Sequence, residues 1–270
     1  MSAKAAPRLK LQIVSDLHLE FRPNDLDFII PSAPVLCLLG DICVIGTTED
    51  FETYKRFINT IYDKFALIIH VPGNHEYYTT RSKDAACPIE KVNARLKAYS
   101  KTRPKLCVLI NNMMKLKIAK TNYYIIGSTL WTYVNPQDYK SIQSSMNDYN
   151  CITVLNKETG TPRPYRVEDM QKLHRKCVAC IKKFTAIAKQ DQAKCILLTH
   201  HKAFRDKLHP RSQAYESDLA ELFVSPIVLA AYGHTHKKFN GTVNGVRTVS
   251  NPRGYPGERT MFNPKFTVTV

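Results

Sequence analysis

The sequence predicts a mixed α/β protein in which two β-sheets pack together and helices lie outside them. Two observations support this fold class. Apolar, strand-like runs recur along the chain, and several are followed by helical patterns, as is typical of α/β proteins. The stretches NNMMKLKIAKTNYYIIGSTLW and KKFNGTVNGVRTVSN each contain paired strand-like runs around turn signals, which indicates β-hairpins. A chain of 270 residues can bury a large core, and we expect one domain over residues 1–270.

Five of the strand-like runs share one form, an apolar segment that ends in a short polar cluster. They read LQIVSDLH, PVLCLLGD, FALIIHVPGNHE, KCILLTHH and PIVLAAYGHTH. A turn that follows a buried strand often carries catalytic groups, because the rigid strand holds them in place. The five clusters are therefore candidate functional positions.

Helical periodicity is clearest in two segments. The first begins near Thr48, with Glu49 and Asp50 in its first turn as the helix dipole favours. The second runs from about 167 to 189, and its apolar stripe includes Cys177 and Cys180. Weaker helical patterns cover residues 87–100, 138–145 and 212–223, whereas the prolines and glycine of 156–165 predict an irregular loop.

Composition indicates an intracellular protein with a basic surface. The opening residues have no long apolar segment, and no apolar stretch approaches the ~20 residues that span a bilayer. We therefore expect a cytoplasmic location without membrane contact. The eight cysteines lack the spacing of a secreted scaffold, so we expect free thiols, and the lone CxxC at Cys177 and Cys180 is expected to pack in the core.

The net charge of +16 and the pI of about 9.5 predict a surface that attracts anions. The basic residues are scattered, without a dense run or an aromatic-interleaved RNA-binding signature. Two partners stay open at this point: nucleic acid, and a phosphate-bearing small substrate.

The polar clusters together contain a set of metal ligands. Residues two apart in extended backbone point to the same side, so Asp16 and His18 are expected to direct two donors to one place, and His234 and His236 have the same spacing. Parallel strands bring their carboxyl ends to a common edge, where open α/β sheets bind ligands. The clustered side chains are Asp16, His18, Asp41, Asn74, His75, His200, His201, His234 and His236.

This set exceeds what one tetrahedral zinc ion needs, so it predicts two ions that share a carboxylate. Asp41 is the expected bridge. Imidazole and amide ligands favour Mn, Fe, Co, Ni or Zn over Mg or Ca, which prefer oxygen shells, and among these we favour manganese. Because few of the ligands are anionic, the site should stay electropositive and suit an anionic substrate such as a phosphate ester.

The chain resembles the calcineurin-like metallophosphoesterases, whose pattern is D-x-H, G-D, G-N-H-[DE], a lone H, and G-H-x-H. The corresponding blocks SDLHL, LLGDI, PGNHEY, LLTHH and YGHTH occur in this order. The stretches GSTLWT, SMNDYNCI, VSNPRGYPGE and FNPKFTVTV are similar to a compact stand-alone branch of the superfamily. The resemblance implies a four-layer α/β/β/α sandwich.

The resemblance also implies the role of each residue. One metal would be bound by Asp16, His18, Asp41 and His236, and the other by Asp41, Asn74, His200 and His234. A hydroxide that bridges the metals would attack phosphorus in line. His75 would then be the general acid that protonates the departing alkoxide. His201, Arg253, Asn147 and Asp148 would either bind phosphate or support the pocket.

One departure from the family pattern bears on the substrate. The protein phosphatase branch reads G-D-x-V-D-R-G, with an aspartate that supports the catalytic histidine and an arginine that binds phosphate. GDICVIG has Val44 and Ile45 at those positions, which argues against protein phosphatase activity. We expect a phosphomonoesterase or phosphodiesterase for small or nucleotide-like substrates; the alternatives are a metal-dependent nuclease and a catalytically idle binding module of the same fold.

Overall fold

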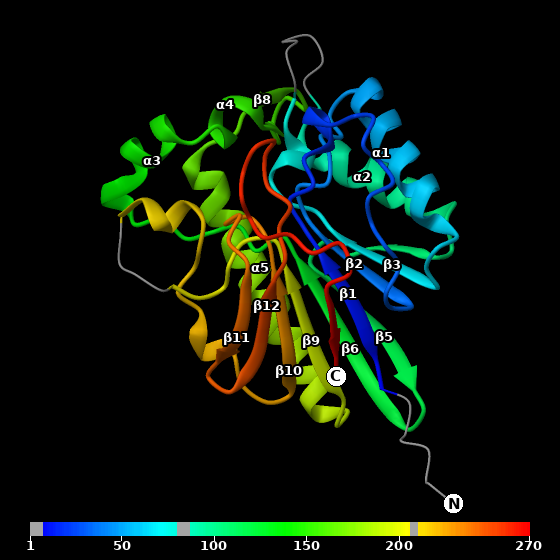
Figure 1. Ribbon diagram of the computed structural model, residues 1–270. Helices are drawn as coiled ribbons and strands as arrows, with labels where there is room; N and C mark the ends of the chain where they lie inside the picture. Colours follow the sequence, from blue (N-terminus) through cyan, green and yellow to red (C-terminus); the bar gives the residue numbers. More distant parts are fainter. Residues whose placement is uncertain (1–7, 80–86, 206–209) are drawn as a thin grey trace, which may run out of the picture.

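The computed structural model describes residues 8–79, 87–205 and 210–270. Two large mixed sheets lie face to face, and helices cover their outer faces (Figure 1). α1 and α2 lie on the side of the first sheet, and α5 packs on β6 and β9 of the second. The predicted α/β/β/α sandwich is confirmed. No helix among the described residues combines the length and the apolar content needed to cross a bilayer.

The first sheet has the strand order β13-β1-β2-β3-β4. β1 to β4 are parallel to one another, and β13 pairs antiparallel with β1. The strands are β1 (Lys10–Val14), β2 (Val35–Leu39), β3 (Leu67–Val71), β4 (Leu106–Val108) and β13 (Thr267–Thr269). The first three end directly before the predicted polar clusters.

The second sheet has the strand order β11-β12-β10-β9-β6-β5. Its four central strands are parallel, whereas the edge strands β11 and β5 pair antiparallel as the predicted hairpins. The strands are β5 (Asn112–Ile118), β6 (Thr121–Ser128), β9 (Lys194–Thr199), β10 (Ile227–Tyr232), β11 (Phe239–Val243) and β12 (Val246–Ser250).

Alternation along the strands divides the core. Val35, Cys37 and Leu39 of β2 face the second sheet and join Leu198 and Leu229 there, while the intervening β2 residues face the helices. β2 is buried on both faces, as expected for a central parallel strand.

The eight cysteines are free thiols, and burial raises the pKa of Cys37. Cys177 lies in the buried core, as expected, whereas Cys180 is only partly buried, so the prediction that it packs in the core was wrong.

The helices with the clearest periodicity form where expected. α1 begins at Thr48, after Thr47, whose hydroxyl accepts the Asp50 backbone N–H. The weaker patterns at 87–100 and 138–145 correspond to α2 and α3. The helices are α1 (Thr48–Tyr62), α2 (Ile89–Lys101), α3 (Tyr139–Ser145), α4 (Asp148–Cys151) and α5 (Val167–Gln190).

The expected helix at 212–223 was wrong. The chain forms two short 3-10 turns, η5 (Pro210–Ala214) and η6 (Ala220–Leu222). Between them Ser217 N–H donates to the Lys202 carbonyl and Leu219 N–H donates to the Ala203 carbonyl. These long-range hydrogen bonds use backbone groups that a continuous helix would need for itself.

The irregular loop expected at 156–165 was also wrong in part. β7 (Thr153–Leu155) and β8 (Pro162–Pro164) form a small antiparallel pair. Pro162 and Pro164 have no N–H to donate, but a two-stranded ribbon leaves every other N–H facing away from the partner strand. Proline is tolerated at those positions, and Arg163 between them retains its donor.

Candidate binuclear metal centre

The polar clusters of both sheets meet at one edge of the sandwich. Asp16 and Asp41 follow β1 and β2 of the first sheet, whereas His200 and His234 follow β9 and β10 of the second. Hydrogen bonds join the two sheets here. Among them, His234 N–H donates to Asp16 Oδ1 over 2.8 Å, and His200 Nδ1 lies 2.9 Å from the Leu39 carbonyl oxygen. The candidate site therefore belongs to the junction of two sheets and not to one of them.

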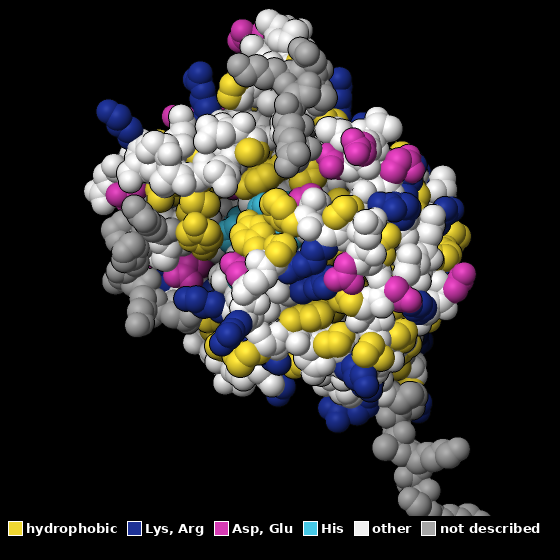
Figure 2. Space-filling model, turned by 45° about the horizontal axis from the view of Figure 1, so that its top comes forward, with side chains coloured by type: hydrophobic (Ala, Val, Ile, Leu, Met, Phe, Trp, Pro, Cys, Tyr) yellow, Lys and Arg dark blue, Asp and Glu magenta, His cyan; other side chains and the backbone are white. Residues whose placement is uncertain are grey.

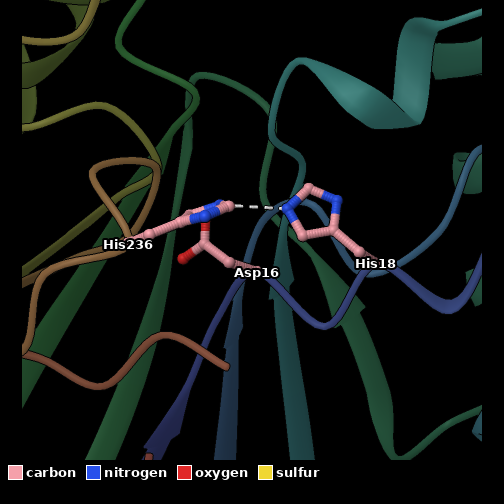
Figure 3. A group of neighbouring side chains, drawn as sticks. All are labelled: Asp16, His18 and His236. Atoms are coloured by element: carbon pink, nitrogen blue, oxygen red, sulfur yellow. Dashed lines mark hydrogen bonds and ion pairs between the residues drawn. The ribbon is translucent and has the colours of Figure 1, made fainter. Parts of the chain in front are cut away.

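One group of possible ligands comprises Asp16, His18 and His236. Their ligand atoms all lie within 4.8 Å of one another. Figure 3 shows the two imidazoles facing each other, with the Asp16 carboxylate beside the His236 ring. The two Nε2 atoms are 3.0 Å apart, and His236 Nε2 is 3.5 Å from Asp16 Oδ1.

A second group comprises Asp41, His200 and His234, again within 4.8 Å. His200 Nε2 lies 3.1 Å from His234 Nδ1 and 3.0 Å from Asn74 Oδ1, so the asparagine oxygen belongs to the same cluster. Asp41 faces both groups, because Oδ1 is 3.4 Å from His200 Nε2 and Oδ2 is 3.9 Å from His18 Nε2. This arrangement is the one expected of a bridging carboxylate.

The donor set fits divalent cations. Asp16 Oδ2 is buried and has no hydrogen-bond partner among the described residues. Leaving such an oxygen unpaired costs free energy that a cation would offset. The Nε2 atoms of His18 and His236 face each other, and a cation between them would accept an electron pair from each. Nitrogen and oxygen donors in this mixture suit Mn, Fe, Co, Ni or Zn.

The backbone at the site is left-handed at five of the seven predicted ligands. The φ angles are 54° at Asp16, 47° at His18, 53° at Asp41, 65° at His234 and 50° at His236. The extended backbone expected at these pairs was therefore wrong, although their side chains do converge. A side chain in this region costs about 1–3 kcal/mol, and such strain is concentrated at functional sites. Asp16 N–H donates to the Gly40 carbonyl and His18 N–H donates to the Asp41 carbonyl, and these bonds hold the backbone of Asp16 and His18 in place.

Gly73 permits the close packing around Asp41. A Cβ at this position would overlap Asp41 Oδ1 and approach the His200 ring. Any side chain here would displace the two ligands. Gly73 is therefore the residue that the close packing of Asp41 and His200 allows at this position.

Carboxylates outside the two groups contact two of the histidines. His18 Nδ1 lies 3.0 Å from Glu20 Oε1, and His236 Nδ1 lies 2.6 Å from Glu258 Oε2. Such partners orient a ligating imidazole and raise its basicity. Sequence reasoning missed Glu20 and Glu258; the position of Glu20 two residues after His18, in SDLHLE, was the available signal.

Glu76 ties together the turns that carry Asp41 and Asn74. Its side chain is buried and accepts backbone N–H groups of Asp41, Ile42 and Gly73 over 2.9, 2.9 and 2.7 Å. This explains the glutamate of PGNHEY without a contact to substrate. It keeps the backbone of the bridging residue in place.

His75 lies beside the predicted metal ligands, on the turn η2 (His75–Tyr77). Its ring stacks on Tyr78, and its Nε2 is 3.1 Å from the Tyr255 hydroxyl and 4.0 Å from Asp41 Oδ2. Burial lowers the pKa of His75, but the charge of Asp41 and the hydrogen bond to Glu20 outweigh it and raise the pKa to about 9.

The four residues expected to bind phosphate or support the pocket are placed differently from one another. Asn147 lines the cavity wall. Asp148 is buried, and its Oδ1 accepts hydrogen bonds from Asn74 Nδ2 over 2.9 Å and from the Tyr78 hydroxyl over 2.6 Å. It therefore orients a predicted ligand.

His201 and Arg253 lie outside the residues that line the two cavities next to the site. His201 Nδ1 is 3.0 Å from the Thr129 carbonyl, and burial with the neighbouring His200 lowers the pKa of His201 to about 3. Arg253 pairs with Asp25 and lies 3.7 Å from the Phe28 ring centre.

Two cavities of about 900 and 920 Å³ adjoin the site and share His75, Tyr78, Asn147 and Tyr255. The first also contains lysines, and the second is lined by apolar and acidic groups. Figure 2 shows histidine side chains at the bottom of this hollow, bordered by hydrophobic side chains. The further lining groups include Lys202, Lys237, Lys238 and Tyr215 in the first cavity and Phe21, Pro23, Val44 and Glu49 in the second.

The fold and this site define a class, an α/β/β/α sandwich with a candidate binuclear metal centre where two sheet edges meet. The calcineurin-like phosphoesterase family matches residues 9–238. The chain belongs to that family of metal-dependent phosphoesterases. It is 30% identical over 287 residues to uncharacterized protein L509 of Acanthamoeba polyphaga mimivirus, covering 94% of each chain.

Solved structures share the fold. Phosphopantetheinyl hydrolase (PptH) from Mycobacterium tuberculosis superposes with a TM-score of 0.69 at 18% identity, covering 92% of this chain and 90% of that one. The protein TT1561 of Thermus thermophilus gives a TM-score of 0.52 at 11% identity, covering 91% of this chain and 90% of that one.

Proposed function

We propose that this protein hydrolyses phosphate monoesters or diesters of small or nucleotide-like substrates, with His75 as the general acid and two divalent ions, manganese favoured, as cofactors. The observation that carries the proposal is the position of His75. Its Nε2 lies 4.0 Å from the expected bridging carboxylate, where both cavities meet. A proton donor beside a candidate metal centre is what cleavage of a phosphoester with a poor leaving group requires.

The residues divide the work. Asp16, His18, Asp41 and His236 would hold one ion, and Asp41, Asn74, His200 and His234 the other. When bound, such ions supply Lewis acidity toward phosphoryl oxygens and a water ionised near neutral pH. His75 donates its Nε2 proton to the departing oxygen. The Tyr255 hydroxyl oxygen lies 3.1 Å from this nitrogen, and the departing oxygen would lie at a similar distance from it.

The cavities favour a small anionic ester. Lys237 and Lys238 border the first cavity and would attract phosphate charge. Val44 and Ile45 occupy the aspartate and arginine positions of the protein phosphatase pattern, so this segment provides no phosphate-binding arginine. Nucleic acid stays a less favoured partner, motivated by the net charge of +16.

The test uses purified protein incubated with Mn²⁺ and assayed on phenyl phosphate, 4-nitrophenyl phosphate and bis(4-nitrophenyl) phosphate. We expect His75→Asn to lower the rate on phenyl phosphate by roughly 10²–10⁴-fold while it keeps its metal. His174→Asn, in α5 and outside both cavities, is the matched control and should retain the wild-type rate.

Two outcomes would overturn the proposal. If no ester is cleaved with Mn²⁺, nor with Fe, Co, Ni or Zn ions in its place, the protein is a binding module of this fold. If DNA is cleaved instead, with a rate that falls steeply with salt, the nuclease hypothesis replaces it.

A further inference from the structure

His75 lacks the carboxylate that the G-D-x-V-D-R-G segment supplies to the catalytic histidine in the protein phosphatase branch. Val44 and Ile45 occupy the relevant positions of GDICVIG, and both are apolar and almost fully buried. A buried imidazole that has to present one nitrogen to substrate still needs a partner for the other. The partner comes from a different loop.

Glu20 provides this partner. Its Oε1 lies 2.9 Å from His75 Nδ1 and 3.0 Å from His18 Nδ1, so two imidazoles converge on one carboxylate oxygen. The glutamate side chain is only 7% exposed, and its Oε2 has no hydrogen-bond partner in the described part of the chain. Both histidine contacts therefore depend on a single, well-shielded oxygen.

The backbone under Glu20 is held in place. The residue lies in η1 (Leu19–Phe21), where Leu19 N–H donates to the Ile42 carbonyl and Phe21 N–H donates to the His18 carbonyl. The first of these bonds attaches η1 to the turn that carries Asp41. The carboxylate thus has a set position relative to the metal ligands.

The His75 ring is held on its remaining sides. Tyr78 stacks on it at 4.1 Å between ring centres, and the backbone N–H of His75 donates to Asp41 Oδ1 over 2.9 Å. The Tyr255 hydroxyl at Nε2 can donate or accept a hydrogen bond, so it does not fix which ring nitrogen carries the proton. A carboxylate at Nδ1 only accepts, so it keeps a proton on that nitrogen.

We propose that Glu20 is the positioning residue of the general acid: it holds Nδ1–H of His75 and thereby directs a protonated Nε2 at the leaving oxygen. The inference rests on the proposed function. When water attacks phosphorus, the bond from phosphorus to the leaving oxygen breaks, and its electron pair stays on that oxygen, which takes the Nε2 proton. His75 is left neutral, still bonded to Glu20 through Nδ1–H.

The leaving group provides a test that a merely structural role would not pass. A proton donor matters most for poor leaving groups and little for nitrophenolate, which departs without protonation. For Glu20→Gln we expect kcat on phenyl phosphate to fall roughly 10²-fold further than kcat on 4-nitrophenyl phosphate. In the His75→Asn background the same substitution should leave the ratio of the two rates unchanged, because the two residues act as one unit on the leaving group.

Glu258→Gln is the matched control. Glu258 supports the ligand His236 in the way that Glu20 supports His18, but no contact joins it to His75 among the described residues. It should lower the rate on both esters alike. Bound metal is measured in each variant by mass spectrometry, since Glu20 also contacts His18.

Each result decides the question. If Glu20→Gln loses metal and both activities in equal proportion, Glu20 serves His18 alone and the proposal is wrong. Should Glu20→Gln fail to fold, Glu20→Asp, which keeps the charge and withdraws it by one methylene, takes its place with the same expected selectivity. A wild-type protein that cleaves neither ester refutes the proposed function, whereas equal losses in an active protein refute this inference only.

Discussion

The two halves of the candidate metal centre differ in what supports them. In the half that contains Asp16, both histidines rest on carboxylates, Glu20 and Glu258, and the His236 side chain is 16% exposed. In the half that contains Asn74, the Asp148 carboxylate accepts a hydrogen bond from Asn74, whereas His200 is fully buried and lies against the backbone carbonyl of Leu39. Both histidines of the first half therefore have carboxylate partners, and one of them is partly open to solvent, whereas His200 in the second half is enclosed and has a backbone partner.

This difference has consequences for metal binding and stability. Carboxylate partners make imidazoles stronger ligands, so the affinity of the Asp16 half should depend on side chains that can be removed singly. In the Asn74 half, His200 is held by a backbone carbonyl and by packing. Changes there should affect folding as well as metal binding.

The largest effect is expected for Asp41→Asn, because Asp41 faces both halves. Replacing its charge should remove both ions and the activity together. Metal content after dialysis and the rate on phenyl phosphate check this. Asp63→Asn, a 90% exposed carboxylate beyond the end of α1, is the control and should change neither. Retention of two ions by Asp41→Asn would contradict its bridging role.

Next in size is the contrast between His200→Ala and His236→Ala. His200→Ala should lower the free energy of unfolding by roughly 2–4 kcal/mol, as large-to-small core substitutions do. It should also prevent metal binding in the Asn74 half. Truncation of the more exposed His236 should empty the Asp16 half at a cost below about 1 kcal/mol. Chemical denaturation of the metal-free proteins measures the difference. Equal losses of stability would erase the distinction between the two halves.

A smaller effect is expected when a supporting carboxylate is removed. Glu258→Gln should weaken Mn²⁺ binding in the Asp16 half by about 10–100-fold and leave the other half unchanged. Titration with Mn²⁺, followed calorimetrically, should resolve the two affinities. Glu221→Gln, an exposed carboxylate of η6, should bind as the wild type does. A uniform loss across both sites would show that the support is shared.

The smallest effect concerns a residue remote from both halves. Asp169 accepts the Arg166 backbone N–H at the start of α5 and pairs with Arg163 through two hydrogen bonds of 2.6 and 2.7 Å. Asp169→Ala should lower the free energy of unfolding by about 1 kcal/mol, as the loss of a helix cap does, without a change in metal content. Thermal unfolding and metal analysis check the two statements.

The pH dependence of this effect has a definite sign. Burial raises the pKa of Asp169, but the hydrogen bonds and the charge of Arg163 outweigh it and lower the pKa below its usual value. The folded state therefore binds the proton less tightly than the unfolded chain. The stabilisation by Asp169 is present above the unfolded pKa of about 3.9 and is lost as the pH falls through the folded value. A difference between wild type and Asp169→Ala that persists in full at low pH would exclude this ion pair as its source.

The amino-acid sequence alone was sufficient to predict several of the structural elements. Local periodicity and capping residues predicted α1 from Thr48 and α5 over most of its length, because these signals depend on residues within a few positions of each other. The residue types at the strand ends predicted a metal site, since carboxylates, amides and imidazoles are the groups that bind such ions. The expected helix at 212–223 failed because its backbone bonds to residues that lie ten or more positions earlier.

Tertiary structure alone decided how the site is built. Glu20 and His75 are 55 positions apart, and His18 and His236 are 218 apart, so no local pattern could show that they touch. The left-handed backbone at Asp16 and Asp41 is equally invisible in the sequence, because it is held by hydrogen bonds and packing from other segments. Residue chemistry determined what the site can bind; the packing of two sheets determined which atoms face one another, since that energy comes only from contacts formed on folding.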